Sequence, residues 1–304
     1  MRKLRIVIKA FLLTGSIIYA ITGCIPTKSE FTPSSSENMM ITSPTVQTPI
    51  FIASTGSPPT LTLISTIPPT LTAGERQIAV SELLTTNSGC LLPCWWGITP
   101  GKTSWVEARH FLDSFMIYIA EQGSSELFYE SVEVPLPAPY SNATYMAHTY
   151  LVKSGVVDSI EIYNFNLAPN YYFPKFLETY GQPAEVWIRT FSQEEMGIQP
   201  FLIDLFYPGK GILVEYSTGY PMKDVGGKLQ NCLKGLDSPF IFLWSPEKQY
   251  LSFQDAKQKF LNTSSLPEPR PLLEATGMDL KTFYETYRKP ETNICLETDK
   301  NLWP

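Results

Sequence analysis

Hydrophobic and polar positions alternate with different periods along residues 77–304. A Thr-Pro-Gly turn at 99–101 is followed by Ser104 and Glu107 in capping-box spacing, which predicts that a helix begins there. Five apolar residues then recur at helical spacing: Trp105, Ala108, Leu112, Phe115 and Ile119. This stripe is typical of a helix face that packs against a core, and it predicts one helix through residue 119.

Strand-like segments follow this helix at 127–134, 144–152 and 156–163. The last two are separated by Lys153-Ser154-Gly155, which suits a hairpin turn. A second helix is predicted at 171–180, where Gly181 ends it, and further strands are predicted at 184–191, 201–207 and 212–216. The segment Pro208-Gly209-Lys210-Gly211 supplies the second hairpin turn. Beyond residue 218 the pattern predicts a strand at 240–244, helices at 252–261 and 279–288, and a proline-rich connector at 266–271.

The order of one helix and three strands therefore occurs twice. Antiparallel hairpins combined with helices predict an α+β fold, in which helices cover one face of an antiparallel sheet. The recurrence suggests two helix-plus-three-strand repeats, although the sequence identity between the two units is low. Residues 77–304 are long enough to form one large domain with its own core.

The residues before this domain have a different composition. Between residues 25 and 76, 27 of 52 residues are Ser, Thr or Pro. Such a segment cannot bury a core, so we expect residues 24–76 to form an extended stalk.

The first 23 residues have the features of a signal peptide. Basic residues at the start, Arg2 to Lys9, precede an apolar run that ends at Ile21 and is too short for a membrane-spanning helix. The segment Ile21-Thr22-Gly23-Cys24 resembles the lipobox of bacterial lipoproteins. The resemblance implies cleavage after Gly23 and diacylglycerol on the Cys24 sulfur, which would place the protein at the cell membrane as a lipid-anchored, extracytoplasmic protein. The alternative is an ordinary secretory signal with a chance cysteine.

The charge balance limits the possible partners. The whole chain has a net charge of −6, and removal of residues 1–23 takes away four basic residues and no acidic ones, which leaves −10. An acidic surface repels phosphate backbones, so we expect no nucleic-acid partner and no electrostatic attraction to an anionic membrane.

Four cysteines lie in the folded part: Cys90, Cys94, Cys232 and Cys295. In an oxidising compartment, two disulfides are expected rather than a metal site. Three pairings are possible, and we favour Cys90 with Cys94 and Cys232 with Cys295, because either alternative ties the C-terminal tail to the start of the domain. The Cys-x3-Cys spacing also suits zinc, but no histidine lies near it in the sequence.

The motif Pro93-Cys94-Trp95-Trp96-Gly97 is the strongest candidate for a binding site. Exposed tryptophans are common contacts for partners and sugar rings. Paired tryptophans are more often core residues, and adjacent residues in an extended segment point in opposite directions, so we expect one of Trp95 and Trp96 to be buried and at most one to be available for binding.

Catalytic signals are few. His110 and His148 have no nucleophilic serine motif to pair with, and Gly226-Gly227-Lys228 lacks the spacing of a phosphate loop. Three pairs of carboxylates suit glycoside hydrolysis in principle: Glu194 with Glu195, Asp158 with Glu161, and Asp204 with Glu215. Acidic residues are abundant in this chain, so such pairs are more often solvated surface groups.

The predicted arrangement resembles that of small envelope lipoproteins of the outer-membrane-assembly type and of the β-lactamase-inhibitor-protein fold. This resemblance depends on residues 97–101, which lead into a helix, and residues 177–183, which end one. We expect a membrane-tethered protein that binds a protein or glycan partner and is not an enzyme, with no cofactor and no metal. The alternatives are an envelope glycan hydrolase that uses paired carboxylates and a purely structural spacer.

Overall fold

The structure is a computed structural model, and it describes residues 71–114, 118–136, 145–163, 169–191, 201–217, 223–233, 239–261, 267–289 and 295–303. The signal peptide, Cys24 and most of the predicted stalk lie outside the described residues, as do Phe115, Glu194 and Glu195. All the described residues belong to one compact unit of the chain, residues 64–304.

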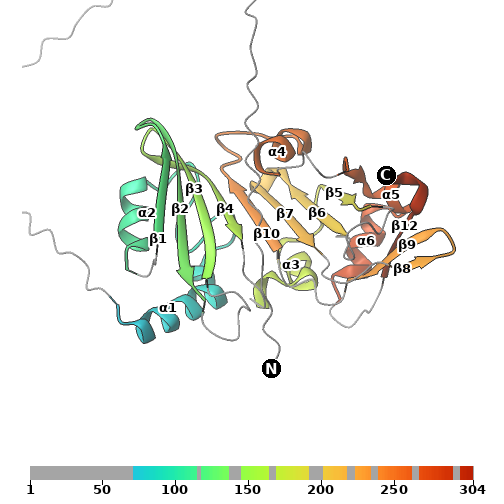
Figure 1. The fold of residues 1–304 in the computed structure, drawn as a ribbon, viewed down its shortest axis with the longest axis horizontal. Coiled ribbons are helices and arrows are strands. Elements are labelled where there is room, and N and C mark those ends of the chain that lie inside the picture. The colour runs from blue at the N-terminus through green and yellow to red at the C-terminus, as the bar shows by residue number, and fades with distance from the viewer. Residues whose placement is uncertain are drawn as a thin grey trace, which may run out of the picture. The chain divides into compact units, whose positions relative to one another are not determined.

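Antiparallel sheets form the framework of this unit, as the predicted α+β class requires (Figure 1). The large sheet has nine strands, in the order β1 (Tyr118–Gly123), β2 (Leu127–Pro135), β3 (Tyr145–Lys153), β4 (Val156–Tyr163), β10 (Pro239–Trp244), β7 (Ile212–Ser217), β6 (Leu202–Tyr207), β5 (Glu185–Arg189) and β11 (Arg270–Pro271). The small sheet has the order β12 (Cys295–Asp299), β9 (Lys228–Cys232) and β8 (Lys223–Val225). The α-helices are α1 (Ala73–Thr86), α2 (Trp105–Leu112), α3 (Phe173–Tyr180), α4 (Phe253–Phe260), α5 (Leu272–Thr276) and α6 (Leu280–Tyr287).

Local capping and turn signals place several elements where the sequence predicts them. Ser104 caps α2 through the backbone N–H of Glu107, and Ser252 caps α4 through that of Asp255. The turn between β3 and β4 uses Ser154 and Gly155, whose φ angles of +50° and +76° suit a tight hairpin. The prediction of one helix as far as residue 119 is wrong, because α2 ends at Leu112 and residue 119 lies in β1.

The start of the folded part also differs from the expected boundary. Helix α1 begins at Ala73, four residues before position 77, inside the segment assigned to the stalk. The Thr72 hydroxyl accepts a hydrogen bond from the backbone N–H of Glu75, and the Glu75 carboxylate accepts one from the backbone N–H of Thr72, which completes a capping box. Val80 and Leu84 of this helix are fully buried in the core. The folded part therefore begins inside the Ser/Thr/Pro-rich segment, because the capping box and the burial of two apolar side chains stabilise a helix there.

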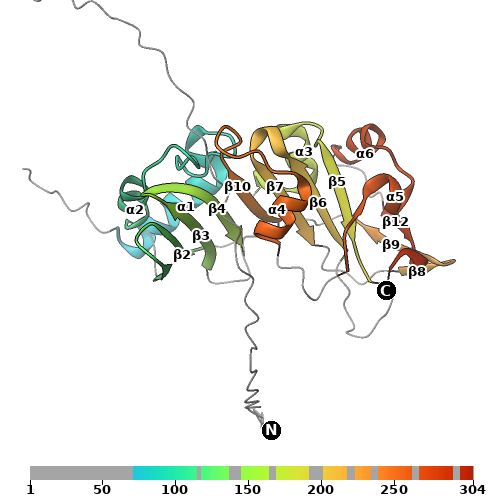
Figure 2. The ribbon, with the colours of Figure 1, turned by 90° about the horizontal axis from the view of Figure 1, so that it is seen from above.

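Both faces of the strands β10, β7 and β6 are buried, and β5 has one buried face and one half-buried face. Along β6, Ile203 and Leu205 belong to one core and Phe206 to another, as the alternation of side chains in a strand requires. Helix α4 packs its Phe253 and Phe260 on the Phe206 side, whereas α1, α2, α3, α5 and α6 contribute to the other core. Figure 2 shows α3 and α4 on opposite sides of the sheet. The expectation that helices cover only one face is thus wrong for α4.

A helix followed by antiparallel strands occurs twice, as α2 with the four strands β1 to β4 and as α3 with the three strands β5 to β7, but the two units are not repeats related by rotation. In the sheet, β2, β3 and β4 lie in chain order on one side of β10, with β4 next to it. Strands β5, β6 and β7 lie on the other side, with β7 next to β10. Strands β4 and β7 are both antiparallel to β10, so they run parallel to each other. Helices α2 and α3 lie on the same face, where Trp105 packs near Tyr150 and Phe176 near Tyr216. The helices lie on the same face and the matching strands run in the same direction, but the strands follow one another toward β10 from opposite edges of the sheet. The two units are therefore related as mirror images and cannot be superimposed by a rotation.

The small sheet is joined by the second disulfide. Cys232 and Cys295 are register partners on β9 and β12, and they form the disulfide that we favoured. Trp303 donates from Nε1 to the Thr298 hydroxyl at 3.0 Å, and that hydroxyl donates to the carbonyl of Ala275 in α5 at 2.6 Å. These contacts attach the small sheet to the main core. No helix among the described residues is both long and apolar enough to cross a membrane.

Candidate functional site

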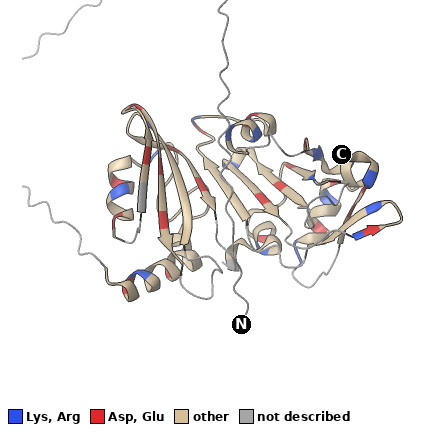
Figure 3. Cartoon of the chain, viewed as in Figure 1, with Lys and Arg blue, Asp and Glu red and all other residues tan. Residues whose placement is uncertain are grey.

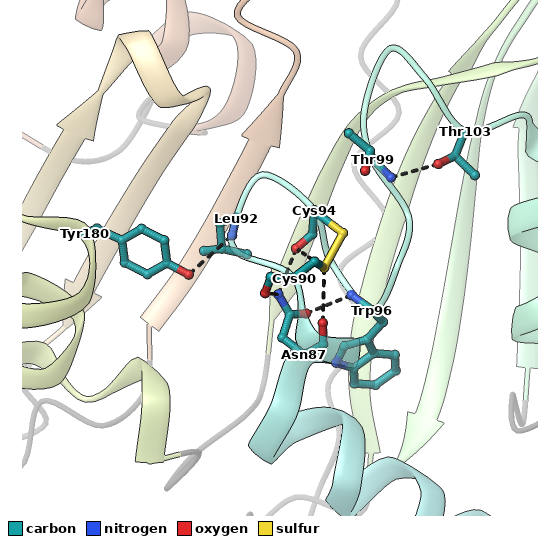
Figure 4. The surroundings of a disulfide bond; sticks show 8 residues. All are labelled: Asn87, Cys90, Leu92, Cys94, Trp96, Thr99, Thr103 and Tyr180. Carbon is teal, nitrogen blue, oxygen red and sulfur yellow. Dashed lines mark hydrogen bonds between the residues drawn. A yellow bond between two sulfur atoms is a disulfide. The ribbon is translucent and has the colours of Figure 1, made fainter.

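The loop between α1 and α2 is closed by the first disulfide, Cys90–Cys94, again the pairing that we favoured. The Asn87 side-chain amide donates to the carbonyl oxygens of Cys90 and Cys94, both at 2.8 Å, and Asn87 Oδ1 accepts from the backbone N–H of Trp96 at 2.8 Å (Figure 4). One buried asparagine therefore satisfies three backbone groups of the loop. The loop is rigid because both its covalent link and its polar groups hold one conformation.

Both tryptophans of this loop are buried, so neither is available for the binding role considered for them. Trp95 and Trp96 have exposed fractions of 0% and 1%. The chain is not extended here: Trp95 and Ile98 exchange two backbone hydrogen bonds of 2.9 Å around a two-residue turn, in which Trp96 has a φ of +54° and Gly97 one of +87°. This turn brings both rings to the same side, where they stack with centroids 5.2 Å apart. They are core residues and no platform for a ligand.

His148 lies beneath these rings. It is fully buried in β3, its ring centroid is 4.8 Å from that of Trp96, and its Nδ1 lies 3.1 Å from the Tyr150 hydroxyl. Burial lowers the pKa of His148 to about 3, so the ring is neutral at physiological pH. This histidine packs in the core, whereas His110 is exposed on α2.

The structure brings together one of the predicted carboxylate pairs. Asp204 on β6 and Glu215 on β7 are register partners, with exposed fractions of 0% and 7%. Arg189 on β5 forms a buried ion pair with Glu215. Burial raises the pKa of both carboxyl groups, and the charge of Glu215 raises that of Asp204 further. A glycan cannot reach a carboxyl group that is enclosed to this degree, so this pair lends no support to a hydrolase.

The second pair, Asp158 and Glu161, lies at the border between β4 and α4. Asp158 has no register partner on β3 because β4 is irregular at this point, and its carboxylate pairs with Lys259 of α4 at 3.2 Å. Glu161 accepts a hydrogen bond from the Tyr163 hydroxyl, and burial raises the pKa of Glu161. Both side chains are half-buried, so solvent reaches them.

Beside this border, one side of β2, β3 and the adjoining part of β4 has no helix of the described residues packed against it, whereas Tyr163 at the end of β4 packs against the core beneath α4. We call this side the open face, and its members are Leu127, Tyr129, Ser131, Glu133, Tyr145, Ala147, Thr149, Lys153 and Glu161. Leu127, Tyr129 and Tyr145 are 47%, 46% and 37% exposed. Sequence reasoning missed this surface, although the alternating strands were its signal.

Acidic residues outnumber basic ones along the strands of the large sheet. In the large sheet, eight strand positions are acidic and three are basic: Glu121, Glu130, Glu133, Asp158, Glu161, Glu185, Asp204 and Glu215 against Lys153, Arg189 and Arg270. Figure 3 shows these acidic positions along the strands and many of the basic residues on the helices. At the border with α4, Lys259 pairs with Asp158. On the open face itself, two residues are acidic, Glu133 and Glu161, and one is basic, Lys153. Glu133 and Glu161 have no ion-pair partner among the described residues.

The open face and the disulfide-closed loop are therefore the surface features that the fold builds from well-defined elements. Comparison with family models, with curated proteins and with solved structures finds no match to this chain, so its function is inferred from these residues.

Proposed function

We propose that this chain is a membrane-tethered, extracytoplasmic lipoprotein whose folded domain binds a protein partner through the open face and catalyses no reaction. The observation that carries the binding role is the unequal covering of one side of the sheet. Helix α4 covers β10, β7 and β6 on that side, whereas β2, β3 and β4 leave Leu127, Tyr129 and Tyr145 exposed. Exposed aromatic groups among small polar residues are typical of protein interfaces.

The charge of the open face indicates the chemistry of the partner. Glu133 and Glu161 of this face are half-buried, so their charges are only partly screened by water, whereas its one basic residue, Lys153, is exposed at the end of β3. A partner that places Lys or Arg opposite them would gain ion pairs and would be steered to the face by the negative charge of the chain. We therefore infer a partner with a basic contact surface.

The tether and the compartment are supported by the sequence of the N-terminus and by the disulfides. Residues 21–24 have the residue order of a lipobox. The four cysteines of the folded part form two disulfides, and disulfides persist in oxidising compartments. Intact-mass measurement tests the tether: a lipid-sized mass on the membrane-extracted chain should disappear in a Cys24→Ala variant. An unlipidated chain in both cases would contradict it.

Site-specific photo-crosslinking in cells tests the binding role. A photoreactive phenylalanine analogue at Tyr129 or Tyr145 should give a discrete adduct, and the same analogue at Val106, 79% exposed on α2, should not. Ala147→Arg adds a bulky cation at the centre of the open face and should abolish the adduct without lowering the melting temperature. Equal adducts at Val106, or adducts that survive Ala147→Arg, would contradict the proposal.

A further inference from the structure

A pocket of about 380 Å³, open to solvent, lies beside the disulfide-closed loop and shares no residue with the open face. Five segments of the chain line it, and the lining residues are Leu91, Leu92, Pro93, Cys94, Thr99, Pro100, Lys102, Thr179, Tyr180, Gly209, Lys210, Ser245, Pro246 and Glu247. Its volume is in the range of small-molecule sites, which runs from about 300 to 1,000 Å³. Four of the lining residues, Leu92, Cys94, Thr99 and Tyr180, are drawn in Figure 4.

The walls of this loop pocket are held in place by close backbone packing. A Cβ atom at Gly211 would lie 2.0 Å from the carbonyl oxygen of Trp244, and one at Gly101 would lie 2.7 Å from the Ser245 Cβ. Only glycine fits at these two positions, so the turns that carry Lys210 and Lys102 are pressed against the same segment, 244–246. A pocket that is formed in advance loses little entropy when a ligand binds.

The opposite wall is fixed by hydrogen bonds and by the disulfide. The backbone N–H of Leu92 donates to the Tyr180 hydroxyl at 3.3 Å, which links the loop to the end of α3. The backbone N–H of Thr99 donates to the Thr103 hydroxyl at 2.9 Å, which fixes the turn before α2 (Figure 4). The pocket is thus built by contacts between segments that are far apart in the sequence.

The charged groups of the loop pocket are two lysines and one glutamate. The Lys102 ammonium pairs with Glu247 at 3.2 Å, and both side chains are more than 60% exposed. Lys210 is exposed and has no ion-pair partner within the described ranges. The lining therefore has a net positive charge in a chain whose total is −6. The remaining lining is largely apolar, from leucines, prolines and the Tyr180 ring.

We propose that the loop pocket binds a small organic anion, with the apolar body of the ligand against the prolines and leucines and its carboxylate at the Lys210 ammonium. An ammonium at the mouth of an apolar pocket supplies both the orientation and the selectivity for the anion. Lys102 is held by Glu247, so it contributes less. This binding site does not depend on the open face or on the partner proposed for it.

Ligand-observed fluorine NMR tests this site on the purified full-length chain, with 4-fluorophenylacetate as the probe and 4-fluorophenylacetamide as its neutral match. The acid should bind saturably and more tightly than the amide. Lys210→Gln should weaken binding of the acid by about threefold to fivefold, the value expected for one exposed ion pair. Glu247→Gln should act in the opposite direction and tighten it by about twofold to threefold, because it releases the Lys102 ammonium.

The matched control is Lys223→Gln, which removes an exposed lysine of β8 outside the pocket and should leave the affinity unchanged. All three substitutions are at exposed positions, and an unchanged melting temperature shows that each variant is folded. The proposal is overturned by equal affinity for acid and amide, by equal effects of Lys210→Gln and Lys223→Gln, by weaker binding in Glu247→Gln, or by no saturable binding at all.

Discussion

Replacement of Asp204 by asparagine is expected to stabilise the fold at neutral pH. The Asp204 side chain is fully buried and faces Glu215 across β6 and β7. The neighbouring guanidinium, Arg189, bonds to Glu215, and no donor from the described residues reaches either carboxylate oxygen of Asp204. A charged Asp204 would thus be buried beside a second negative charge, without a hydrogen bond to stabilise it.

The expected magnitude follows from the proton that this arrangement requires. Burial, reinforced by the charge of Glu215, raises the pKa of Asp204 well above its usual range, so the folded state favours the protonated acid. Holding that proton at pH 7 costs about 1.36 kcal/mol for each pH unit above the unfolded pKa of about 3.9, or up to about 4 kcal/mol. Asparagine has a similar shape and needs no proton.

The sign of the pH effect is fixed by the same shift. Because the folded pKa of Asp204 is above the unfolded one, the stability associated with this proton is complete below about pH 4 and is lost as the pH rises towards the folded pKa. Asp204→Asn should therefore match the wild type near pH 4 and exceed it by about 1 to 4 kcal/mol at pH 7. Urea unfolding followed by tryptophan fluorescence at a series of pH values measures this difference.

The matched control is Asp158→Asn on β4, whose carboxylate is half-buried and paired with Lys259. This change should cost no more than about 1 kcal/mol at every pH, as is usual for accessible ion pairs. The reasoning is refuted if Asp204→Asn is less stable than the wild type at pH 7, or if the two proteins keep a constant difference between pH 4 and pH 8.

Three further predictions concern the framework and use the same unfolding assay. Removal of the disulfide in a Cys232→Ser, Cys295→Ser double variant should cost roughly 4 kcal/mol, because the bond closes a loop of 63 residues; a loss below about 1 kcal/mol would contradict this. Gly211→Ala should cost more than about 2 kcal/mol, whereas Gly155→Ala, with a similar φ but open space, should cost about 1 kcal/mol; equal losses would contradict the close packing. Trp95→Ala should cost about 3 to 5 kcal/mol, and a neutral effect would contradict its core role.

Elements with local signals could be predicted from the sequence, since the physical cause of each lies within a few residues. The cap at Ser104 and the turn at Ser154 are such cases, and both are where the pattern places them. The favoured disulfide pairing is also the one that the structure shows, and it was preferred because either alternative ties the C-terminal tail to the start of the domain. In contrast, Trp96 was misplaced because its positive φ belongs to a two-residue turn, and a Trp at such a position is too rare to expect.

The covering of the sheet had a signal that the sequence analysis did not use. Strands β6, β7 and β10 are almost continuous apolar runs, which is typical of strands buried on both faces, whereas β2 alternates, which is typical of one covered face. The contrast predicts a helix on the second face of the former group and none over the latter. The order of strands, and with it the mirror-image relation of the two units, depends on pairings between distant segments and has no local signal.

The position of β10 also sets the order in which the sheet can be assembled. This strand is in the middle of the large sheet, between β4 and β7, yet it follows both units in the sequence (Figure 1). Ile241 pairs with Ile162, so the two halves are joined by a contact that spans about 80 residues. Until residue 239 is available, β4 and β7 each keep an unpaired edge, which is the kind of surface that pairs with other chains. Helix α4 follows β10 directly, so the middle strand is inserted and the second face is covered only late in the synthesis of the chain, and until then the two open edges are exposed to pairing with other chains.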